Sequence, residues 1–423
     1  MSTIYALSSG AGRAGVAIVR VSGPAAGAIV GGLTGSLPEP RMAALRTLTA
    51  RDGRAIDRGL VLWFPAPGSF SGEDMAEFQV HGGAAILELL MAEIAAIGPA
   101  RLADAGEFTR RAFLNQKLDL TAAEGIADLI DAETEAQRKQ ALRQSTGALA
   151  ELYQRWHGDL LRGLAHFEAA IDFVDEEDLP EDLAGQVSER LSPLRDELRR
   201  HLQGASAGER LHQGLQVAIV GPPNAGKSTL INHLSRRDVA IVSDIPGTTR
   251  DVLEVRCDLN GYPVTFVDTA GLRQSDDQIE QEGVRRARQR AANADLVIAM
   301  LPADHAWSDS EFDSYDGWND SGHTVEVLRV MSKTDLGSTA GSTAETGHGG
   351  LSEENACHEG VAPPLPISVT TGDGMDTFLE TLADRAAKLM DTVSGALPTR
   401  RRHREGLETC LAHLDQFFTG AET

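Results

Sequence analysis

The spacing of hydrophobic residues changes several times along this chain, and each change predicts a different kind of structure. Over residues 3–100, short apolar runs such as GVAIVRVSG alternate with turn residues, and helical spacing follows at 83–97. This pattern predicts a small α+β domain. The capping box Thr121-x-x-Glu124 then opens a region in which apolar residues recur every three or four positions. Long bundle helices are predicted there, with a second helix at 183–202.

The second change follows the Gly- and Ser-containing stretch 203–209, which is predicted to be a domain boundary. From Leu215 the chain alternates apolar strands with a glycine-rich loop and a helix, as in a parallel α/β sheet. Later strands are predicted at 263–268, 294–301 and 324–331. Residues 337–363 are rich in Gly, Ser, Thr and Ala and are predicted to be a disordered insert. Helical spacing over 376–418 is expected to return to the earlier helices.

Composition limits the class of protein. A chain of 423 residues predicts several domains, and 39 basic against 62 acidic side chains give a net charge of −23. Contact with nucleic acid must therefore be local. No run approaches the ~20 apolar residues of a membrane span, and no secretory signal is recognised at the N-terminus. Cys257, Cys357 and Cys410 have neither disulfide nor zinc spacing, so a reducing cytoplasm is expected.

The segment Gly221-Pro-Pro-Asn-Ala-Gly226-Lys227-Ser228 follows an apolar strand and precedes a helix, which is the context of a phosphate-binding loop. In such a loop the glycines let backbone N–H groups surround the phosphates. Lys227 contacts the β- and γ-phosphates, and the Ser228 hydroxyl ligates Mg²⁺. The alternative is a strand-to-helix turn that binds nothing, which this context disfavours.

Two later segments carry the chemistry expected around such a loop. Asp268-Thr-Ala-Gly271 ends a strand, where an acid can reach the hydration shell of Mg²⁺. In the preceding loop, Thr249 is predicted to be the second Mg²⁺ ligand, although a polar turn is the commoner role for such a residue. Leu272 stands where Ras-like enzymes have a glutamine that orients water, so another group must orient the attacking water here.

The segment Ser332-Lys333-Thr334-Asp335 follows an apolar strand and is similar to the N/T-K-x-D motif with which GTPases bind guanine. A carboxylate accepts hydrogen bonds from the N1–H and amine of guanine, and adenine offers no such pair. Ser332 replaces the usual Asn, so weaker affinity with retained guanine preference is expected. Ser368-Val369-Thr370 follows the next strand, at the position of the last guanine loop, which disfavours a solvated turn as the alternative.

From about Thr3 to about Leu414, the chain resembles the MnmE (TrmE) family of tRNA modification GTPases. Beyond the motifs above, the resemblance rests on GRAGVAIVRVSGP, SFSGEDMAEFQVHGG, GEFTRRAFLNQKLDLTAAEGIADLIDA and EAAIDFVDEE. It implies a multidomain α/β plus α fold. The expected parts are an α+β folate-binding and dimerisation domain (1–117), a discontinuous helical domain (118–208 and 377–423), and an inserted Ras-like P-loop G-domain (209–376).

The resemblance also implies ligands. Arg20, Glu77 and Lys117 match residues that contact a 5-formyl-tetrahydrofolate-type cofactor, although each alone is typical of a solvated charge. A potassium ion near the phosphates is implied, with ligands at Asn224, Ser243, Ile245 and Thr248. Glu280 matches the glutamate that orients the attacking water and would act in place of Leu272, with Lys227 and Asp268 as the other catalytic residues, although a lone Glu is more often a solvated helix-start residue. The residues expected to contact GTP are Asn224, Ala225, Gly226, Lys227, Ser228, Thr229, Ser243, Asp244, Ile245, Pro246, Gly247, Thr248, Thr249, Asp268, Thr269, Ala270, Gly271, Ser332, Lys333, Asp335, Ser368, Val369 and Thr370.

For function, the resemblance implies that GTP hydrolysis is coupled to C5 modification of the tRNA wobble uridine, of the carboxymethylaminomethyl or aminomethyl type. A homodimer would act with the FAD-dependent protein MnmG (GidA) in a heterotetramer. Two other functions stay open, a regulatory or ribosome-assembly GTPase without one-carbon chemistry and a folate-binding scaffold.

Three features near the C-terminus bear on this expectation. The chain ends in FFTGAET rather than the family's C-x-G-K tail, so the modification chemistry is the part we expect to be affected. Cys410 is expected to be a small buried apolar residue rather than a substitute for the tail. The basic run 400–404 is expected to be a solvated helix face rather than an RNA site.

Overall fold

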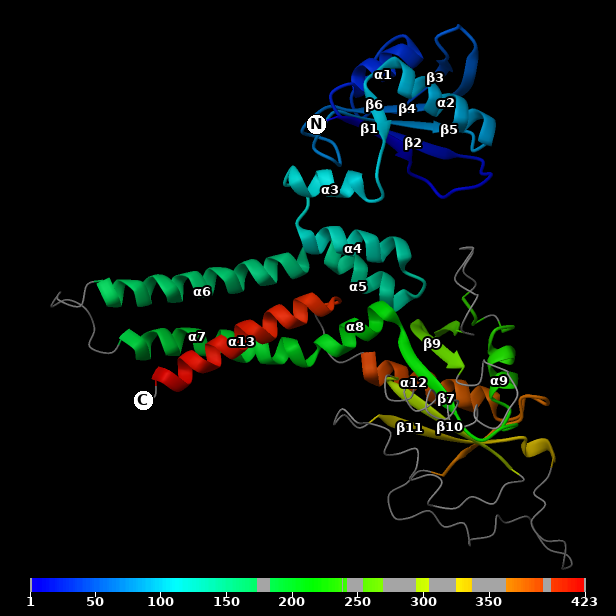
Figure 1. The fold of residues 1–423 in the computed structure, drawn as a ribbon, viewed down its shortest axis with the longest axis vertical. Helices are drawn as coiled ribbons and strands as arrows, with labels where there is room; N and C mark the ends of the chain where they lie inside the picture. The colour runs from blue at the N-terminus through cyan, green and yellow to red at the C-terminus, as the bar shows by residue number, and fades with distance from the viewer. Residues whose placement is uncertain are drawn as a thin grey trace, which may run out of the picture. The chain divides into compact units, whose positions relative to one another are not determined.

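The computed structural model describes residues 2–172, 183–237, 239–241, 254–268, 294–303, 325–336, 363–390 and 397–421 (Figure 1). Two compact units can be distinguished, one comprising Met1–Ile126 with Ser145–Ala150 and the other Ala127–Gln144 with Glu151–Thr423. Each unit contains one six-stranded sheet. Within the described ranges, none of the helices combines the length and the apolar character that a membrane span requires.

The sheet of the first unit has the strand order β3-β4-β5-β2-β1-β6. Its strands are β1 (Thr3–Leu7), β2 (Ala17–Ser22), β3 (Ala44–Thr49), β4 (Ala55–Phe64), β5 (Met75–Val80) and β6 (Ala100–Leu102). Helices α1 (Ala26–Thr34) and α2 (Ala84–Ile97) bury Ile29 and Leu90 against the sheet residues Val19 and Phe78. Because side chains alternate along a strand, Arg20 of β2 lies on the face opposite this core. The predicted α+β pattern is confirmed.

The start of the helical region differs in detail from its prediction. Helix α3 (Glu107–Leu114) follows β6, and α4 (Leu120–Asp131) comes next. The predicted N-cap at Thr121 is wrong, because Oδ1 of Asp119 accepts hydrogen bonds from Ala122 N at 2.9 Å and from the Thr121 hydroxyl at 2.6 Å. Asp and Thr are both good N-cap residues, so composition alone does not separate the two positions.

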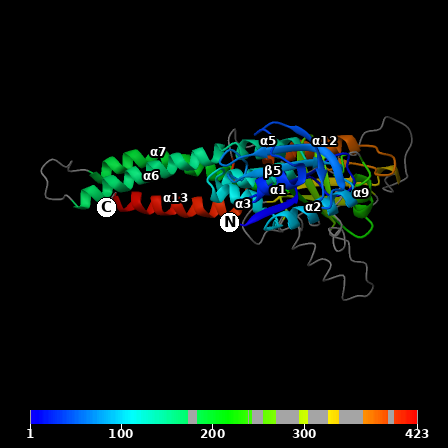
Figure 2. The same cartoon turned by 90° about the horizontal axis from the view of Figure 1, so that it is seen from above.

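Helices from both sides of the second sheet in sequence form the helical region, as predicted. They are α5 (Glu135–Ser145), α6 (Ala148–Asp172), α7 (Leu183–Gln203), α8 (Ala205–Gln213) and α13 (Arg401–Ala421). Helices α6, α7 and α13 run side by side in both views (Figures 1 and 2). They bury Trp156, Leu198 and Leu414 in a shared core. Residues far apart in sequence therefore build one bundle.

The stretch 203–209, predicted to be a boundary, is largely helical. Only Gly204 separates α7 from α8. A Cβ at Gly208 would lie 2.4 Å from the carbonyl oxygen of Pro398 and 2.9 Å from Cβ of Leu397. The glycine at 208 therefore marks a helix in close backbone contact with a distant segment, rather than a loop.

The second sheet has the strand order β12-β11-β10-β7-β9-β8, with only the β8–β9 pair antiparallel among these neighbours. Its strands are β7 (Leu215–Val220), β8 (Glu254–Leu259), β9 (Tyr262–Asp268), β10 (Leu296–Pro302), β11 (Glu326–Ser332) and β12 (Leu365–Pro366). The predicted strands are confirmed close to their expected ranges. The predicted insert over 337–363 lies, apart from Pro363, outside the described residues.

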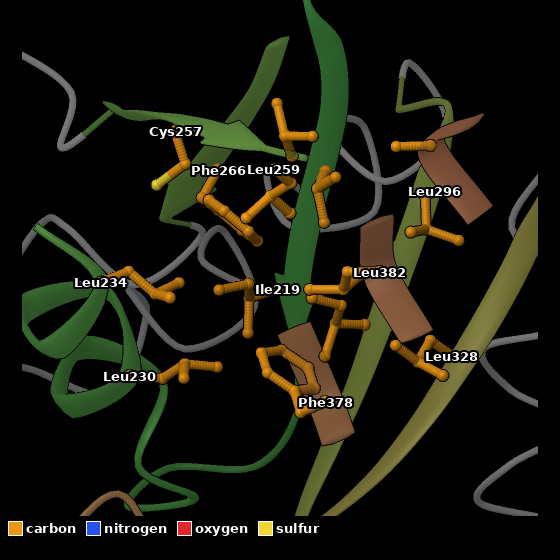
Figure 3. Close-up of a cluster of buried hydrophobic side chains, with 14 of the residues drawn as sticks. Ile219, Leu230, Leu234, Cys257, Leu259, Phe266, Leu296, Leu328, Phe378 and Leu382 are labelled. Carbon is orange, nitrogen blue, oxygen red and sulfur yellow. The ribbon is translucent and has the colours of Figure 1, made fainter. Parts of the chain in front are cut away.

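Helices α9 (Lys227–Leu234) and α12 (Met375–Met390) pack with this sheet. Figure 3 shows Leu230 of α9, Ile219 of β7 and Phe378 of α12 in one apolar cluster. The expected second helical segment, 377–423, thus contains two helices with different neighbours. Helix α12 joins the core of the sheet, whereas α13 joins the helical bundle.

Candidate active site

The predicted phosphate-binding loop connects the C-terminal end of β7 to the N-terminus of α9. Its backbone has positive φ at Gly221 (149°), Asn224 (62°) and Gly226 (91°). A Cβ at Gly221 would lie 2.1 Å from the Met300 carbonyl oxygen of β10, so this approach requires glycine. Gly226 directly precedes α9, so the first N–H groups of the helix are directed at the loop. The loop therefore has the shape and polarity of an anion site.

Lys227 is held over this loop by the loop itself. Its Nζ donates hydrogen bonds to the carbonyl oxygens of Gly221 and Pro222, both at 2.8 Å. Ser228 and Thr229 follow on the first helical turn with exposed side chains. The donor set fits a Mg²⁺-bound nucleotide, because it offers a fixed ammonium group, a helix N-terminus and a serine hydroxyl of the type that ligates Mg²⁺.

The base-binding segment is joined to the phosphate loop by Ser332. This serine is 2 % exposed, and its hydroxyl oxygen lies 2.6 Å from the Ala225 carbonyl and 3.1 Å from the Leu301 carbonyl. A hydroxyl carries one hydrogen, so the shorter contact to Ala225 is the better hydrogen bond. Lys333 follows with φ of 57°, which turns the chain toward Asp335.

Asp335 is oriented by the last predicted guanine loop. The Ser368 hydroxyl donates to Oδ1 of Asp335 at 2.8 Å, and Ser368 itself is fully buried. Val369 is partly buried and Thr370 is exposed beside it. The structure thus brings 332–335 and 368–370 together, and the Asp335 carboxylate is held by Ser368 and exposed, so that it can accept further hydrogen bonds.

The remaining predicted nucleotide residues lie outside the described residues. They are Ser243, Asp244, Ile245, Pro246, Gly247, Thr248, Thr249, Thr269, Ala270, Gly271 and Glu280. The backbone of Asp268 closes β9 and pairs in register with Ile219 of β7. Strand β9 therefore ends beside the strand that leads into the phosphate loop.

A second group of predicted residues lies on the first unit's sheet, on the face opposite α1 and α2. Arg20 of β2 and Glu77 of β5 are register neighbours. Nε and Nη2 of Arg20 donate to Oε1 of Glu77 at 2.9 Å and 2.7 Å. The rings of Phe70 and Phe108 have their centroids 5.4 Å and 5.6 Å from the guanidinium carbon. A guanidinium, a carboxylate and two rings suit a flat heteroaromatic ligand that carries hydrogen-bond donors.

Lys117, the third predicted folate residue, lies against the same loop as Phe70. A Cβ at Gly72 would meet Cγ and Cδ of Lys117 at 3.2 Å and 3.4 Å. Phe70 and Phe108 were missed by the sequence analysis, although both occur within the segments that carry the family resemblance. No local pattern identifies them, because only tertiary packing brings their rings to Arg20.

The basic run at 400–404 is mostly engaged in ion pairs, and its residues Arg401 and Arg402 are exposed. Its pairs are Arg400 with Asp128, Arg401 with Glu405, and Arg404 with Glu209 and Glu408. His403 is buried. Cys410 packs against the helical core, where burial raises the pKa of its thiol, as expected for an apolar role.

A mainly parallel sheet with a phosphate loop after one strand and an Asp held by the neighbouring loop after another is the architecture of a P-loop GTPase. The family model of the GTP-binding protein TrmE N-terminus matches residues 3–117, and that of the MnmE helical domain matches residues 120–423. The chain belongs to the MnmE family of tRNA modification GTPases, and it is accordingly a GTP hydrolase.

Individual relatives extend over nearly the whole chain. The tRNA modification GTPase MnmE of Methylorubrum populi is 49 % identical over 421 residues, covering 99 % of this chain and 88 % of the relative. The human mitochondrial protein named as subunit GTPB3 of the 5-taurinomethyluridine tRNA synthase is 46 % identical, covering 98 % and 84 %. A crystal structure of Aquifex aeolicus Era is 26 % identical with a TM-score of 0.29, covering 40 % of this chain and 56 % of that one.

Proposed function

We propose that this chain couples GTP hydrolysis to C5 modification of the tRNA wobble uridine, of the carboxymethylaminomethyl or aminomethyl type. The observation that carries the proposal is that one chain combines two sites. The second unit holds a phosphate loop joined to a base-binding loop through Ser332. The first holds the Arg20–Glu77 pair beneath two phenylalanine rings, which suits a folate.

In the proposed nucleotide site, each residue has one task. Lys227 would contact the phosphates, and Ser228 and Thr249 would ligate Mg²⁺. Asp268 would contact the hydration shell of the same ion. Asp335 accepts hydrogen bonds from guanine. Glu280 orients the attacking water, because Leu272 has no polar atom for that task.

A potassium ion is proposed as the cation that offsets charge between the β- and γ-phosphates. Its proposed ligands are Asn224, Ser243, Thr248 and the carbonyl of Ile245. Among these, Asn224 is a described residue, and it lies in the phosphate loop with φ of 62° and an exposed side chain. An amide oxygen is a suitable ligand for a hard monovalent cation, and a cation there would act on developing charge as an arginine does.

The proposed folate site and assembly complete the function. Arg20, Glu77 and Lys117 would bind a 5-formyl-tetrahydrofolate-type cofactor. The domains are proposed at 1–117, 118–208 with 377–423, and 209–376, although α12, at the start of the segment 377–423, packs in the core of the second sheet. The chain would act in the cytoplasm as a homodimer through the N-terminal domain, in a heterotetramer with an FAD-dependent partner, on tRNA.

The potassium proposal is tested by GTP hydrolysis at equal ionic strength in potassium and in sodium. We expect faster hydrolysis in potassium, and Asn224→Ala should abolish the difference while leaving GDP binding nearly unchanged. Equal rates in the two salts for the unchanged chain would remove the cation from the mechanism.

The coupling of hydrolysis to modification is tested with Glu280→Ala, in an assay that contains the partner, tRNA and a folate donor. Loss of a positioned acid–base group should lower kcat by about 10²-fold, with GTP affinity retained and modified uridine lost in parallel. Modification that persists without hydrolysis would favour a folate-binding scaffold, whereas a chain that hydrolyses GTP but binds no folate would favour a regulatory GTPase.

A further inference from the structure

A buried polar network lies beside the Arg20–Glu77 pair. Glu73 accepts hydrogen bonds from Nη1 of Arg111 at 2.9 Å and 3.2 Å, and from the Ser22 hydroxyl at 2.7 Å. The side chains of Arg111 and Glu73 are only 5 % and 15 % exposed. A buried charge pair with several directed hydrogen bonds permits little variation in geometry, so the elements it joins are fixed relative to one another.

On one side, the network holds the loop that carries Phe70. A carboxylate only accepts, so the Ser22 hydroxyl donates to Glu73, and the Ser71 hydroxyl must then donate to Ser22, at 2.7 Å. Nδ2 of Asn115 donates to the carbonyl oxygen of Ser71 at 2.7 Å. The loop is therefore attached both to β2, which carries Arg20, and to the segment just before Lys117.

On the other side, the network holds α3, which carries Phe108. Nη2 and Nε of Arg111 donate to Oε1 of Glu107 at 2.9 Å and 3.3 Å. Glu107 also accepts from Arg101 at 2.7 Å and 2.9 Å. The Arg111 guanidinium therefore connects α3 directly to Glu73 in the loop, as only a forked cation can.

We infer that Glu73 and Arg111 are positioning residues of the folate site, an inference that rests on the proposed function of that site. They act through the two segments they join, because Phe70 lies in the loop of Glu73 and Phe108 lies on the helix of Arg111. The pair thus sets the spacing of the two rings around Arg20. The affinity for a reduced folate depends on it, although neither side chain belongs to the predicted ligand contacts.

The test uses the full chain with 5-formyl-tetrahydrofolate as the ligand, and compares Arg111→Met, Arg111→Lys and the double variant Glu73→Gln with Arg111→Met. Affinity is measured by titration calorimetry. Amide hydrogen exchange of residues 68–73 and 106–117 is measured without ligand. Thermal stability and GTP hydrolysis are recorded for each variant.

We expect Arg111→Met to weaken folate binding by about 10- to 100-fold, by analogy with residues that orient metal-binding side chains. It should also accelerate exchange in both segments while GTP hydrolysis is retained. Arg111→Lys should give only partial rescue, because lysine keeps the charge without the fork. The double variant removes the Glu73–Arg111 charge pair and leaves Glu107 with its hydrogen bonds from Arg101, so thermal stability should recover, yet folate binding should stay weak. Recovered stability without recovered folate binding distinguishes a positioning role from a general structural role.

The matched control is Arg51→Met, which breaks the 3.0 Å pair with Glu93 between the β3–β4 turn and α2. It should leave folate affinity unchanged. A double variant that binds folate as the unchanged chain does, with unchanged exchange, would overturn the inference. If the unchanged chain binds no folate, the folate part of the proposed function fails, and the exchange measurement alone decides whether the pair positions these segments.

Discussion

At the scale of single residues, one serine joins the two halves of the nucleotide site. Because the Ser332 hydroxyl bonds the buried Ala225 carbonyl of the phosphate loop, Ser332→Ala leaves that oxygen without this donor. Such a loss costs about 1–3 kcal/mol, and we expect GDP to dissociate about tenfold faster. Stopped-flow fluorescence with a labelled GDP measures the rate. Ser235→Ala, which removes an exposed hydroxyl bond to Asn232, is the control and should leave the rate unchanged.

A second residue makes the stability of α3 depend on pH. Hydrogen bonds from Arg101 lower the pKa of Glu107 to about 2, below the usual 4.5. The stabilisation is therefore complete above about pH 4.5 and is lost as the pH falls toward 2. Glu107→Gln should lower the protection of α3 amides by about 1–3 kcal/mol at pH 7, allowing for screening of the exposed Arg101, and by less at pH 3. Hydrogen exchange corrected for intrinsic rates measures the protection of α3 at each pH. A difference between Glu107→Gln and the unchanged chain that is the same at pH 7 and pH 3 would contradict the prediction.

At the scale of elements, the close contact at Gly208 predicts an unusual effect of alanine in a helix. Alanine normally favours a helix over glycine by about 1 kcal/mol. At Gly208 its Cβ would meet the Pro398 carbonyl oxygen at 2.4 Å, so we expect Gly208→Ala to destabilise the bundle by about 1–3 kcal/mol. Urea denaturation measures the change in the free energy of unfolding, and amide hydrogen exchange in α8 shows where the stability is lost. Gly406→Ala in α13, where a Cβ meets nothing within 4 Å, should stabilise instead.

The elements also show how far the sequence could predict the structure. The strand, phosphate loop and helix around Gly221–Lys227 were predictable because glycine conformation, charge and periodicity all act locally there. Helix α8 was not, because its Gly- and Ser-containing sequence is typical of a linker and its packing partner is Pro398. For the same reason Phe70 and Phe108, whose rings lie beside Arg20, escaped prediction. Sequence identified Arg20 and Glu77 only through a family resemblance, and tertiary packing supplies the two rings.

At the scale of the whole second unit, the chain enters and leaves the nucleotide-binding sheet at one place. Helix α8 leads into β7, and Gly208 of α8 lies against Pro398, just before α13. Nη1 of Arg210 reaches the Leu389 carbonyl of α12 at 3.5 Å, and Nε2 of Gln140 donates to the Leu397 carbonyl at 3.1 Å. The incoming helix α8 thus contacts both α12 and the outgoing segment 397–398, which is also bound to α5.

We therefore expect residues 1–213, joined by a short glycine linker to residues 397–423, to fold with the bundle intact. Circular dichroism measures the helix content, and amide exchange measures the protection of α7 and α13. The fluorescence of Trp156 reports whether the bundle core has formed. A chain whose α13 amides exchange at the unfolded rate would contradict it.

The sheet domain is an insertion whose two ends, at Gly208 and Pro398, lie side by side. The number of residues in this insertion can therefore change without moving either end. Because Gly208 lies against Pro398, a change in the length of a loop within the sheet domain can leave the separation of these two residues unaltered. We expect insertions and deletions within the inserted sheet domain to leave the packing of the flanking bundle helices unchanged.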